Sequence, residues 1–533
     1  MNNMIYVLGS GPAGVSCAYS LVQQGLEVTM LDSGIELESG KKRILETLSN
    51  SNPEDWNKNL LDKIKNNPGV TSSGLDEKWS YGSDFPYRDV DKYIPMETNN
   101  VVIRQSLAKG GLSNVWGAAV LPYIDNDIVD WPISISDLTS HYEAVFSFMN
   151  LAAVSDDLES IFPLYSKNYS ALNQSRQAML FKKDLESNKS KLKANGFIFG
   201  NSRLAVQATP FKKKPGCVYC GLCLYGCPYG LIYNSSDTLN ELLYKENFHY
   251  INNVIVERLK ESNGIVSISG KSRISGEKLD FSGSRVYLAC GTVSSTKILL
   301  ESMEAYEQEV KMKDSQLFLV PMIRYKKAPD TTSENLYTLP QLFIELFDQN
   351  ITRKTINLQI YTYNDLYLNI IKNSFIGLTY PLFKPLINEF LDRLIITMGF
   401  LHSDDSSTIL LKLKKPRNNA SSTLAFKSQI NKNTKRIFKQ VLKKISQNRS
   451  MFKAIPVSIA SKIKMPGQGY HIGGTFPMKR KPSSFETDVL GRPCGFNRVH
   501  VVDSAVFPSV PATTTTLTIM ANAHRIASAF HEL

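Results

Sequence analysis

Apolar and polar residues follow a strand–helix–strand pattern at the start of the chain. The apolar run 5–8 predicts a short buried strand, apolar positions at helical spacing over 15–22 predict a helix, and the apolar run 28–31 predicts a second strand. A similar strand, glycine and helix pattern returns at 279–300, and a further strand is expected within 497–503. The sequence therefore predicts an α/β fold whose parallel sheet is assembled from discontinuous segments of the chain.

The middle of the chain has a different pattern of apolar and polar residues. Apolar and polar residues alternate over 316–320 and 356–361, and further strands are expected over 395–401 and 408–413. Alternation with a period of two is typical of antiparallel strands that bury one face. We expect residues 306–460 to form a substrate-facing α+β domain with an antiparallel sheet.

Three stretches carry weaker patterns. Residues 36–92 are polar and irregular, so they are expected to form loops, and the chain is expected to resume a strand at 101–103. A lysine-rich helix is expected over about 428–447. A chain of 533 residues with 42% hydrophobic residues fits a globular protein of two or three domains.

The turn after the first strand reads G-S-G-P-A-G over residues 9–14. Gly9 permits a tight turn, Gly11 lets backbone N–H groups approach a pyrophosphate at the helix N-terminus, and Gly14 allows close helix–strand packing. Asp32 ends the second strand, where an acid can hydrogen-bond a ribose hydroxyl. The spacing predicts a dinucleotide site rather than an ordinary glycine-rich turn, and these residues alone do not decide between FAD and NAD.

The chain is basic, with 61 Lys and Arg against 49 Asp and Glu and a formal net charge of +12. The excess is spread over short clusters such as 212–214 and 479–481, and no nucleic-acid-binding motif is present. Each cluster is either a solvated face or a contact for an anionic membrane surface or acidic partner. No secretory signal precedes the first strand, and no run reaches the roughly twenty apolar residues that span a bilayer. We expect a cytoplasmic protein without nucleic-acid partners, with peripheral membrane contact as an alternative to a fully solvated surface.

Four of the seven cysteines fall in one stretch, at Cys217, Cys220, Cys223 and Cys227. The spacing C-x2-C-x2-C-x3-C-P is that of bacterial-type iron–sulfur ligands. In two-cluster ferredoxins the fourth cysteine serves the other cluster, so Cys227 either completes a [4Fe-4S] cluster or leaves a [3Fe-4S] cluster on the other three. We predict an iron–sulfur cluster in an inserted loop at about 210–235, with structural zinc or a metal-free loop as the alternatives.

Further motifs complete the layout. Residues 110–116 read G-G-L-S-N-V-W, residues 289–300 hold a strand–glycine–helix turn, and residues 471–475 read H-I-G-G-T. Asp503 ends a strand ahead of the threonine run 513–516. Together with the opening glycine turn, this layout resembles the glucose-methanol-choline (GMC) family of flavin oxidoreductases over most of the chain outside the middle domain.

The resemblance implies a bound FAD. In the family, the opening glycine turn and acid bind the ADP half of FAD, the G-G-x-S-x-x-W stretch lies along the flavin, and a returning acid lies near it. Carried onto this chain, the FAD-binding residues are Gly9, Gly11, Gly14, Asp32, Gly110, Gly111, Ser113, Asn114, Gly291, Asp503 and Thr515. Where some members attach flavin through a histidine, this chain has Val115, so non-covalent FAD is expected.

The resemblance also implies a catalytic base. His471 falls on the family's H-x-x-G-T motif, where a neutral imidazole takes the hydroxyl proton of the substrate while hydride moves to flavin N5. The second active-site residue of the family, a His or Asn, corresponds to Thr514, whose hydroxyl can position a substrate oxygen but is a poor base. His471 and Thr514 are therefore the expected catalytic residues.

The expected enzyme is an FAD-dependent dehydrogenase that oxidises a small-molecule or lipid-linked alcohol. Electrons are expected to leave through the iron–sulfur cluster to a quinone or an acceptor protein. Two alternatives are an O₂-using oxidase with a structural metal at the cysteines and a catalytically degraded binding or assembly protein. The expected organisation is a Rossmann-type FAD-binding domain from residues 1–305 and 461–533, with 306–460 as the substrate-binding domain.

Overall fold

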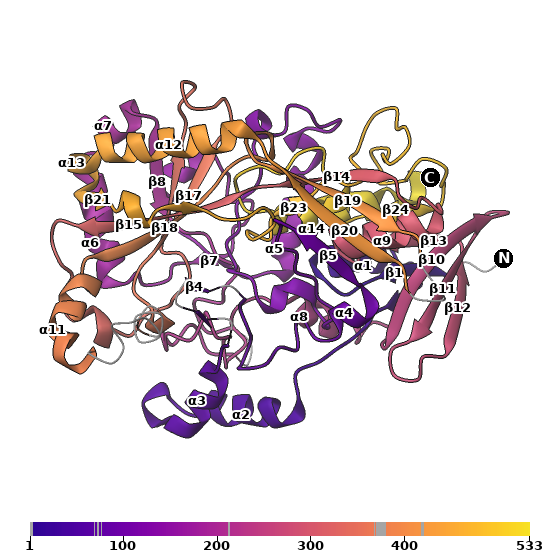
Figure 1. Ribbon diagram of the computed structural model, residues 1–533. Helices are drawn as coiled ribbons and strands as arrows, with labels where there is room; N and C mark the ends of the chain where they lie inside the picture. The colour runs from indigo at the N-terminus through magenta and orange to yellow at the C-terminus, as the bar shows by residue number, and fades with distance from the viewer. Residues whose placement is uncertain are drawn as a thin grey trace.

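The computed structural model describes residues 4–68, 70–71, 74–75, 77–211, 214–366, 368, 380–416 and 421–532. The described chain has a part built on a parallel sheet near the termini and a part built on a large, mainly antiparallel sheet toward the opposite end (Figure 1). The mixed α/β character expected from the sequence is confirmed.

The parallel sheet has five strands. In spatial order they are β24 (Val499–Val501), β13 (Arg285–Leu288), β1 (Ile5–Leu8), β2 (Val28–Leu31) and β9 (Phe248–Ile251). Every residue of β1, β2 and β13 is buried, which is why these strands read as nearly continuous apolar runs rather than as alternating ones. Because all pairings are parallel, the carboxyl ends of the five strands meet at one edge.

Helices cover both faces of the parallel sheet. On one face, α1 (Pro12–Gln23), α8 (Ser235–Leu242) and α14 (Thr516–Ser528) pack with Ile5 and Val7. On the other face, α9 (Thr292–Ser302) packs with Tyr6 and Leu8. The hydroxyl of Ser16 donates to the carbonyl of Met520 at 2.7 Å, so the first and last α-helices of the chain lie against each other.

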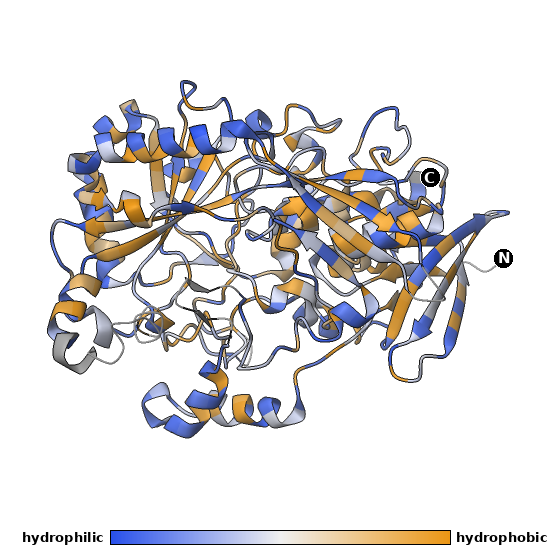
Figure 2. Ribbon diagram, viewed as in Figure 1, coloured by the Kyte–Doolittle hydropathy of each residue, from blue (hydrophilic) through white to orange (hydrophobic). Residues whose placement is uncertain are grey.

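The largest sheet has seven strands. They are β21 (Ala454–Pro456), β15 (Leu317–Arg324), β18 (Leu394–Phe400), β17 (Ile356–Tyr361), β16 (Leu342–Leu346) and β8 (Phe197–Asn201), with β22 (Lys462–Ile463) paired to β15. One face is covered by α6 (Arg176–Glu186), α7 (Lys189–Ala194), α12 (Lys432–Gln447) and α13 (Arg449–Phe452). Figure 2 shows hydrophobic residues along these strands and many hydrophilic residues on α12. The opposite face of the sheet is left to line a cavity.

Three further groups of strands complete the fold. A five-stranded sheet orders β23 (Ile472–Gly473), β14 (Glu309–Asp314), β19 (Thr408–Lys414), β20 (Thr423–Gln429) and β5 (Met96–Asn99). A three-stranded antiparallel sheet of β10 (Val254–Ser262), β11 (Ile265–Ser272) and β12 (Lys278–Gly283) projects at the end of the molecule near the N-terminus (Figure 1). The short pairs are β3 (Val70–Thr71) with β4 (Gly74–Leu75), and β6 (Leu151–Ala152) with β7 (Tyr169–Ser170). The remaining α-helices in the part of the chain that the structure describes are α2 (Ser39–Ser49), α3 (Lys58–Lys65), α4 (Val90–Tyr93), α5 (Thr139–Phe148) and α11 (Tyr380–Leu391).

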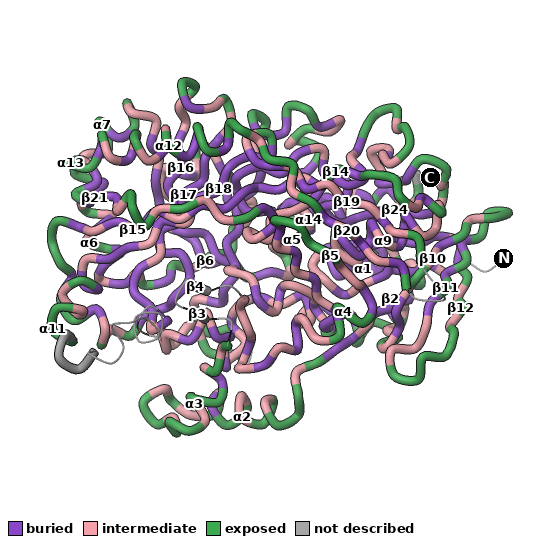
Figure 3. Tube along the Cα trace, in the orientation of Figure 1, coloured by how far each residue is buried: buried purple, intermediate pink, exposed green. Residues whose placement is uncertain are grey.

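The prediction of loops over residues 36–92 was wrong for α2 and α3. These two helices form an arm whose outer side is exposed (Figure 3). Leu48 and Ile64 are buried in one cluster with Leu222 and Tyr225 of the cysteine-rich loop. Their few apolar residues serve a contact with a distant segment. The local sequence is therefore too polar to predict a helix.

Two smaller predictions also differ from the structure. Residues 101–103 lie outside any regular strand, although the Val102 N–H donates to the Pro466 carbonyl at 2.9 Å. The lysine-rich helix starts at Lys432 rather than near 428, because residues 423–429 pair with β19 as strand β20. Among the described residues, each helix is too short or too polar to span a bilayer.

Gly14 gives a test of the close packing between α1 and the glycine turn. A Cβ on this residue would lie 1.9 Å from the carbonyl oxygen of Gly9, so we expect Gly14→Ala to destabilise the protein by about 1–3 kcal/mol. Gly40 in α2 is a matched control, because a Cβ there would meet no atom within 4 Å and alanine favours a helix. Urea unfolding of both variants measures the difference. Equal stability of the two variants would contradict the packing argument.

Candidate active site

A cavity of about 840 Å³ lies at the carboxyl edge of the parallel sheet. Its far wall is the uncovered face of the seven-stranded sheet, including Leu317 and Leu319 of β15 and Met398 of β18. The volume lies within the range of pockets that hold cofactors and substrates. The predicted site residues that line it are Gly9, Gly11, Asp32, Gly111, Ser113, Gly291, His471, Asp503, Thr514 and Thr515.

Three predicted FAD-binding residues lie behind the cavity wall and do not line it. Gly14 packs against the turn at Gly9, as described above. Gly110 has a positive φ of 87° and its N–H donates to the hydroxyl of Ser10 at 2.9 Å. The Asn114 amide donates to the Gly111 carbonyl at 2.7 Å, which holds the second glycine turn closed. These residues shape the two turns rather than face a ligand.

The two glycine turns come close together at the cavity. A Cβ on Gly111 would lie 3.3 Å from the Cα of Gly11, whereas a Cβ on Gly11 would meet no atom within 4 Å. Gly11 also caps the N-terminus of α1, whose first backbone N–H groups have no partner within the helix. Open space before a glycine at a helix N-terminus is a suitable place for a phosphate group.

Asp32 is buried at the end of β2. Its carboxylate accepts hydrogen bonds from the Ser10 N–H at 3.2 Å, the Ser10 hydroxyl at 2.7 Å and the Tyr250 hydroxyl at 2.9 Å. Burial raises the pKa of Asp32, and these hydrogen bonds oppose the rise. Asp32 also lines the cavity, at the end of the second strand, where an acid can meet a ribose hydroxyl of a bound dinucleotide.

Asp503 is the second buried acid at this edge, after β24. It accepts hydrogen bonds from the Ser295 hydroxyl at 2.5 Å and from the Ala505 N–H at 2.9 Å. Burial raises the pKa of Asp503 to about 6. The bond to Ser295 fixes the start of α9 against β24, and Gly291 makes the turn before that helix with a positive φ of 80°.

His471 faces the cavity from the loop before β23. Its ring stacks on Phe400 with centroids 4.5 Å apart and planes 23° apart, and the Ser315 N–H donates to its carbonyl at 2.9 Å. The ring Nδ1 is buried and makes no hydrogen bond within the described structure. Burial lowers the pKa of His471 to about 4, so the imidazole is neutral at neutral pH and can accept a proton.

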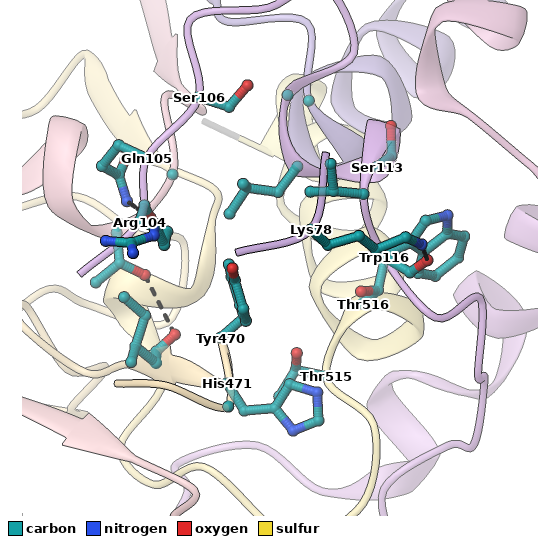
Figure 4. A pocket seen from close by; sticks show the side chains of 18 of the residues that line it. Lys78, Arg104, Gln105, Ser106, Ser113, Trp116, Tyr470, His471, Thr515 and Thr516 are labelled. Carbon is teal, nitrogen blue, oxygen red and sulfur yellow. Dashed lines mark hydrogen bonds between the residues drawn. The ribbon is translucent and has the colours of Figure 1, made fainter. Parts of the chain in front are cut away.

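The threonine run brings the N-terminus of α14 to the same place. Thr514, Thr515 and Thr516 all line the cavity, and Figure 4 shows Thr515 beside the His471 ring. The Thr514 hydroxyl accepts a hydrogen bond from the Leu121 N–H at 2.7 Å, and its own proton can still be donated. His471 and Thr514, which are 43 positions apart in the sequence, therefore share one cavity.

Sequence reasoning missed three polar residues of the cavity wall. The Lys78 ammonium donates to the Trp116 carbonyl at 3.1 Å, and burial lowers the pKa of Lys78 to about 8. Arg104 forms an ion pair with Glu77 at 2.9 Å, and Tyr470 precedes the histidine with a positive φ of 62°. Figure 4 shows these side chains around the cavity. Lys78 lay in a stretch interpreted as loops, and no motif marked Arg104 or Tyr470.

The four cysteines of the predicted cluster line a second, much smaller cavity of about 20 Å³. Backbone N–H groups of Thr338 and Leu231 donate to the sulfur atoms of Cys223 and Cys227 at 3.4 and 3.5 Å. Burial raises the pKa of Cys217 to about 12 and that of Cys227 to about 11. The donor set suits an iron–sulfur cluster, since amide groups already point at two sulfurs.

The present spacing of the thiols does not form a metal site. In the described part of the chain, no three His, Cys, Asp or Glu side chains are arranged to hold a metal ion. A single tetrahedral zinc would bring its thiolates to about 4 Å from each other. An iron–sulfide cube is larger than one ion, and binding either group requires the thiols to rearrange around the small cavity.

The two cavities are close neighbours. Leu224, which directly follows Cys223, lines the large cavity. Lys78 also lines the large cavity, and its positive charge acts on Cys223. Two consecutive residues, Cys223 and Leu224, therefore line the small and the large cavity, respectively.

Comparisons with known proteins place this geometry in context. Residues 415–523 match the family model described as GMC oxidoreductase. Among solved structures, pyridoxine 4-oxidase from Mesorbium loti superposes with a TM-score of 0.62 over 100% of both chains, at 12% sequence identity. A comparison with curated protein sequences gives no match.

These findings support a relation to GMC oxidoreductases. The matched segment contains His471, Asp503, Thr514 and Thr515, which the structure brings to one cavity. The likeness to pyridoxine 4-oxidase shows that the two chains share a fold. The sequence support for the class thus comes from the C-terminal part of the chain, and the comparison of structures supports the fold.

The low pKa of His471 predicts a pH-dependent contribution to stability. Between pH 6.5 and about 4 the unfolded chain binds a proton on this ring that the folded protein does not, so stability falls as the pH falls through this window. In His471→Phe, the slope of the unfolding free energy against pH should be shallower by up to about 1.4 kcal/mol per pH unit. Urea unfolding of both proteins from pH 7 to pH 4.5 measures it. Identical slopes would mean that the folded state does bind this proton.

Proposed function

We propose that the chain is an FAD-dependent oxidoreductase of the GMC type that oxidises an alcohol. The observation that carries the proposal is the position of His471, a half-buried imidazole that is neutral at neutral pH, on the wall of a dinucleotide-sized cavity. The opposite end of that cavity has the glycine turns and buried acid that suit the ADP half of FAD.

Residues from four distant segments would hold the cofactor without a covalent bond. Gly9, Gly11 and the N-terminus of α1 suit the diphosphate, and Asp32 suits the adenosine ribose. The residues that suit the flavin end are Gly111, Ser113, Gly291, Asp503 and Thr515, which line the same cavity. Val115 offers no nucleophile for attachment. When bound, the flavin would supply the hydride acceptor.

His471 acts as the general base in this proposal. Its neutral ring takes the proton of the substrate hydroxyl, so that the carbon atom can release hydride as the C=O bond forms. Stacking on Phe400 fixes the plane of the ring. The Thr514 hydroxyl, which lines the same cavity, would orient the substrate oxygen. The Thr514 hydroxyl cannot replace His471 as the base, because a neutral hydroxyl group binds a proton far too weakly.

The walls of the cavity favour a bulky, amphipathic alcohol. Leu317, Leu319 and Met398 give it an apolar side, whereas Lys78 and Lys462 add positive charge. An apolar wall beside cationic groups suits a molecule that carries both a hydrocarbon part and a polar or anionic part. A lipid-linked or sugar hydroxyl fits this description.

We further propose that the cysteines hold an iron–sulfur cluster that would pass single electrons from the flavin to a quinone or acceptor protein. The nearness of the two cavities at Cys223 and Leu224 supports this finer assignment. The enzyme would then be a dehydrogenase rather than an oxidase. Its proposed location is the cytoplasm, with peripheral membrane contact.

Replacement of the base provides the first test. We expect His471→Asn to lower the rate of flavin reduction by a broad panel of alcohols about 10²–10⁴-fold while FAD content stays unchanged. His249→Asn on strand β9 is a matched control, because its side chain is 57% exposed and lies outside the cavity. Stopped-flow absorbance under anaerobic conditions measures the rate. Flavin-loaded protein that no alcohol bleaches would favour a degraded binding or assembly protein.

The cysteine assignment has its own test. Anaerobically purified protein should contain iron, with cluster absorbance and an EPR signal, and Cys223→Ser should lose most of that iron. Cys494→Ser is the matched control, since Cys494 is exposed and distant in sequence from the cluster loop. Zinc in place of iron, together with substrate-dependent peroxide production in air, would instead support an oxidase with a structural metal.

A further inference from the structure

Four large apolar side chains lie exposed on one end of the molecule. Leu386 and Phe390 belong to α11, Ile455 belongs to β21, and Ile459 follows in the short turn before β22. Ile459 is 98% exposed and Leu386 is 68% exposed. We name these four residues the mouth surface. Both α11 and β21 lie at the end of the molecule away from the N-terminus (Figure 1).

Strand register and packing bring the members of the mouth surface together. Ile455 pairs with Ile323 across the β21–β15 edge, so both side chains point to the same face of the sheet. Ile323 packs in a cluster with Ile387 and Leu391 of α11. Leu386 and Phe390 are four residues apart and therefore lie on one side of that helix. The exposed apolar residues of α11 and β21 thus flank the same packed cluster.

The large cavity opens at the mouth surface. Phe390, Ala460 and Lys462 are each exposed to solvent and also line the cavity. They come from α11, from the turn before β22 and from the first residue of β22. The exposed apolar side chains therefore stand around the entrance through which a substrate reaches His471.

The charged residues around the mouth surface are mainly basic. Lys326, Lys384, Lys453 and Lys462 are exposed on the same elements or directly beside them. The nearby acid Glu389 is engaged by Lys327 at 2.8 Å and by Arg393 at 2.7 Å. Protruding apolar side chains surrounded by lysines match the chemistry of an anionic lipid surface, which accepts apolar groups below a layer of negative headgroups.

We propose that the mouth surface docks on an anionic lipid bilayer, so that the cavity opens toward the membrane and admits amphipathic alcohols from it. A protein partner would need a complementary cavity for these convex, separately protruding side chains, whereas a bilayer accommodates them without one. Substrate entry from the membrane rests on the proposed function. The membrane contact itself stands independently of it.

Vesicle binding by the flavin-loaded, full-length protein tests the apolar part of the surface. The protein should co-sediment with vesicles of phosphatidylcholine and phosphatidylglycerol and bind pure phosphatidylcholine vesicles at least tenfold more weakly. Ile459→Ser should weaken binding to anionic vesicles about tenfold, while Ile274→Ser should leave it unchanged. Ile274 is a matched control because it is 75% exposed in the β11–β12 turn, at the other end of the molecule (Figure 1).

Charge reversal tests the basic part. Lys326→Glu/Lys384→Glu should reduce binding to anionic vesicles at least tenfold, because each lysine near an anionic surface contributes roughly a fivefold factor. Lys260→Glu/Lys278→Glu on the exposed three-stranded sheet is the control with the same change in net charge. Equal losses in both double variants would overturn the assignment of this surface.

The remaining outcomes separate the proposals. Absence of vesicle binding by the wild-type protein, or loss of self-association rather than vesicle binding in Ile459→Ser, would overturn membrane docking in favour of no partner or a second copy. Ile459→Ser should retain flavin reduction by a water-soluble alcohol. Vesicle binding without flavin reduction by any alcohol would leave the membrane contact standing while the proposed function and the substrate route fall.

Discussion

The structure depends on the parallel register that aligns strands from both ends of the chain. The Gly9 N–H donates to the Leu31 carbonyl at 2.8 Å, the Ala289 N–H to the Leu8 carbonyl at 2.9 Å, and the Val502 N–H to the Leu288 carbonyl at 2.9 Å. These three bonds lie just beyond the ends of the strands. They fix the edge of the sheet at which β1, β2, β13 and β24 all end. The glycine turn, both buried acids and the start of α9 are consequently held at one edge of the sheet.

The candidate base is held by a different sheet from the glycine turn and the acids. Both parts of the protein therefore contribute to the site. β23 follows His471 directly and pairs with β14, where Ile472 lies opposite Asp314. Asp314 is buried, with its pKa raised to about 7, and accepts a hydrogen bond from the Gly467 N–H at 2.9 Å. The loop that carries the histidine is thus anchored on both sides, while Phe400 of the seven-stranded sheet sets the orientation of the ring.

The cysteine-rich loop and the mouth surface border the same cluster of packed hydrophobic residues. Cys220 forms a β-bridge with Leu336, and Leu336 packs in the cluster that contains Ile323 and Leu391. In the proposed function, a substrate and an electron acceptor that are both dissolved in a membrane would therefore approach neighbouring parts of the molecule. The cavity between them is lined by His471.

The sequence by itself determined the local chemistry: the glycine turn at 9–14, the acid Asp32, the cysteine spacing and the histidine before a double glycine. Each depends on a few contiguous residues, whose conformational needs can be read directly from their types. Only the tertiary structure decided that β8 joins the sheet of β16, that Lys78 reaches the cavity, and that burial lowers the pKa of His471. Pairing partners, cavity walls and desolvation arise from contacts between residues far apart in the sequence, and no local pattern encodes them.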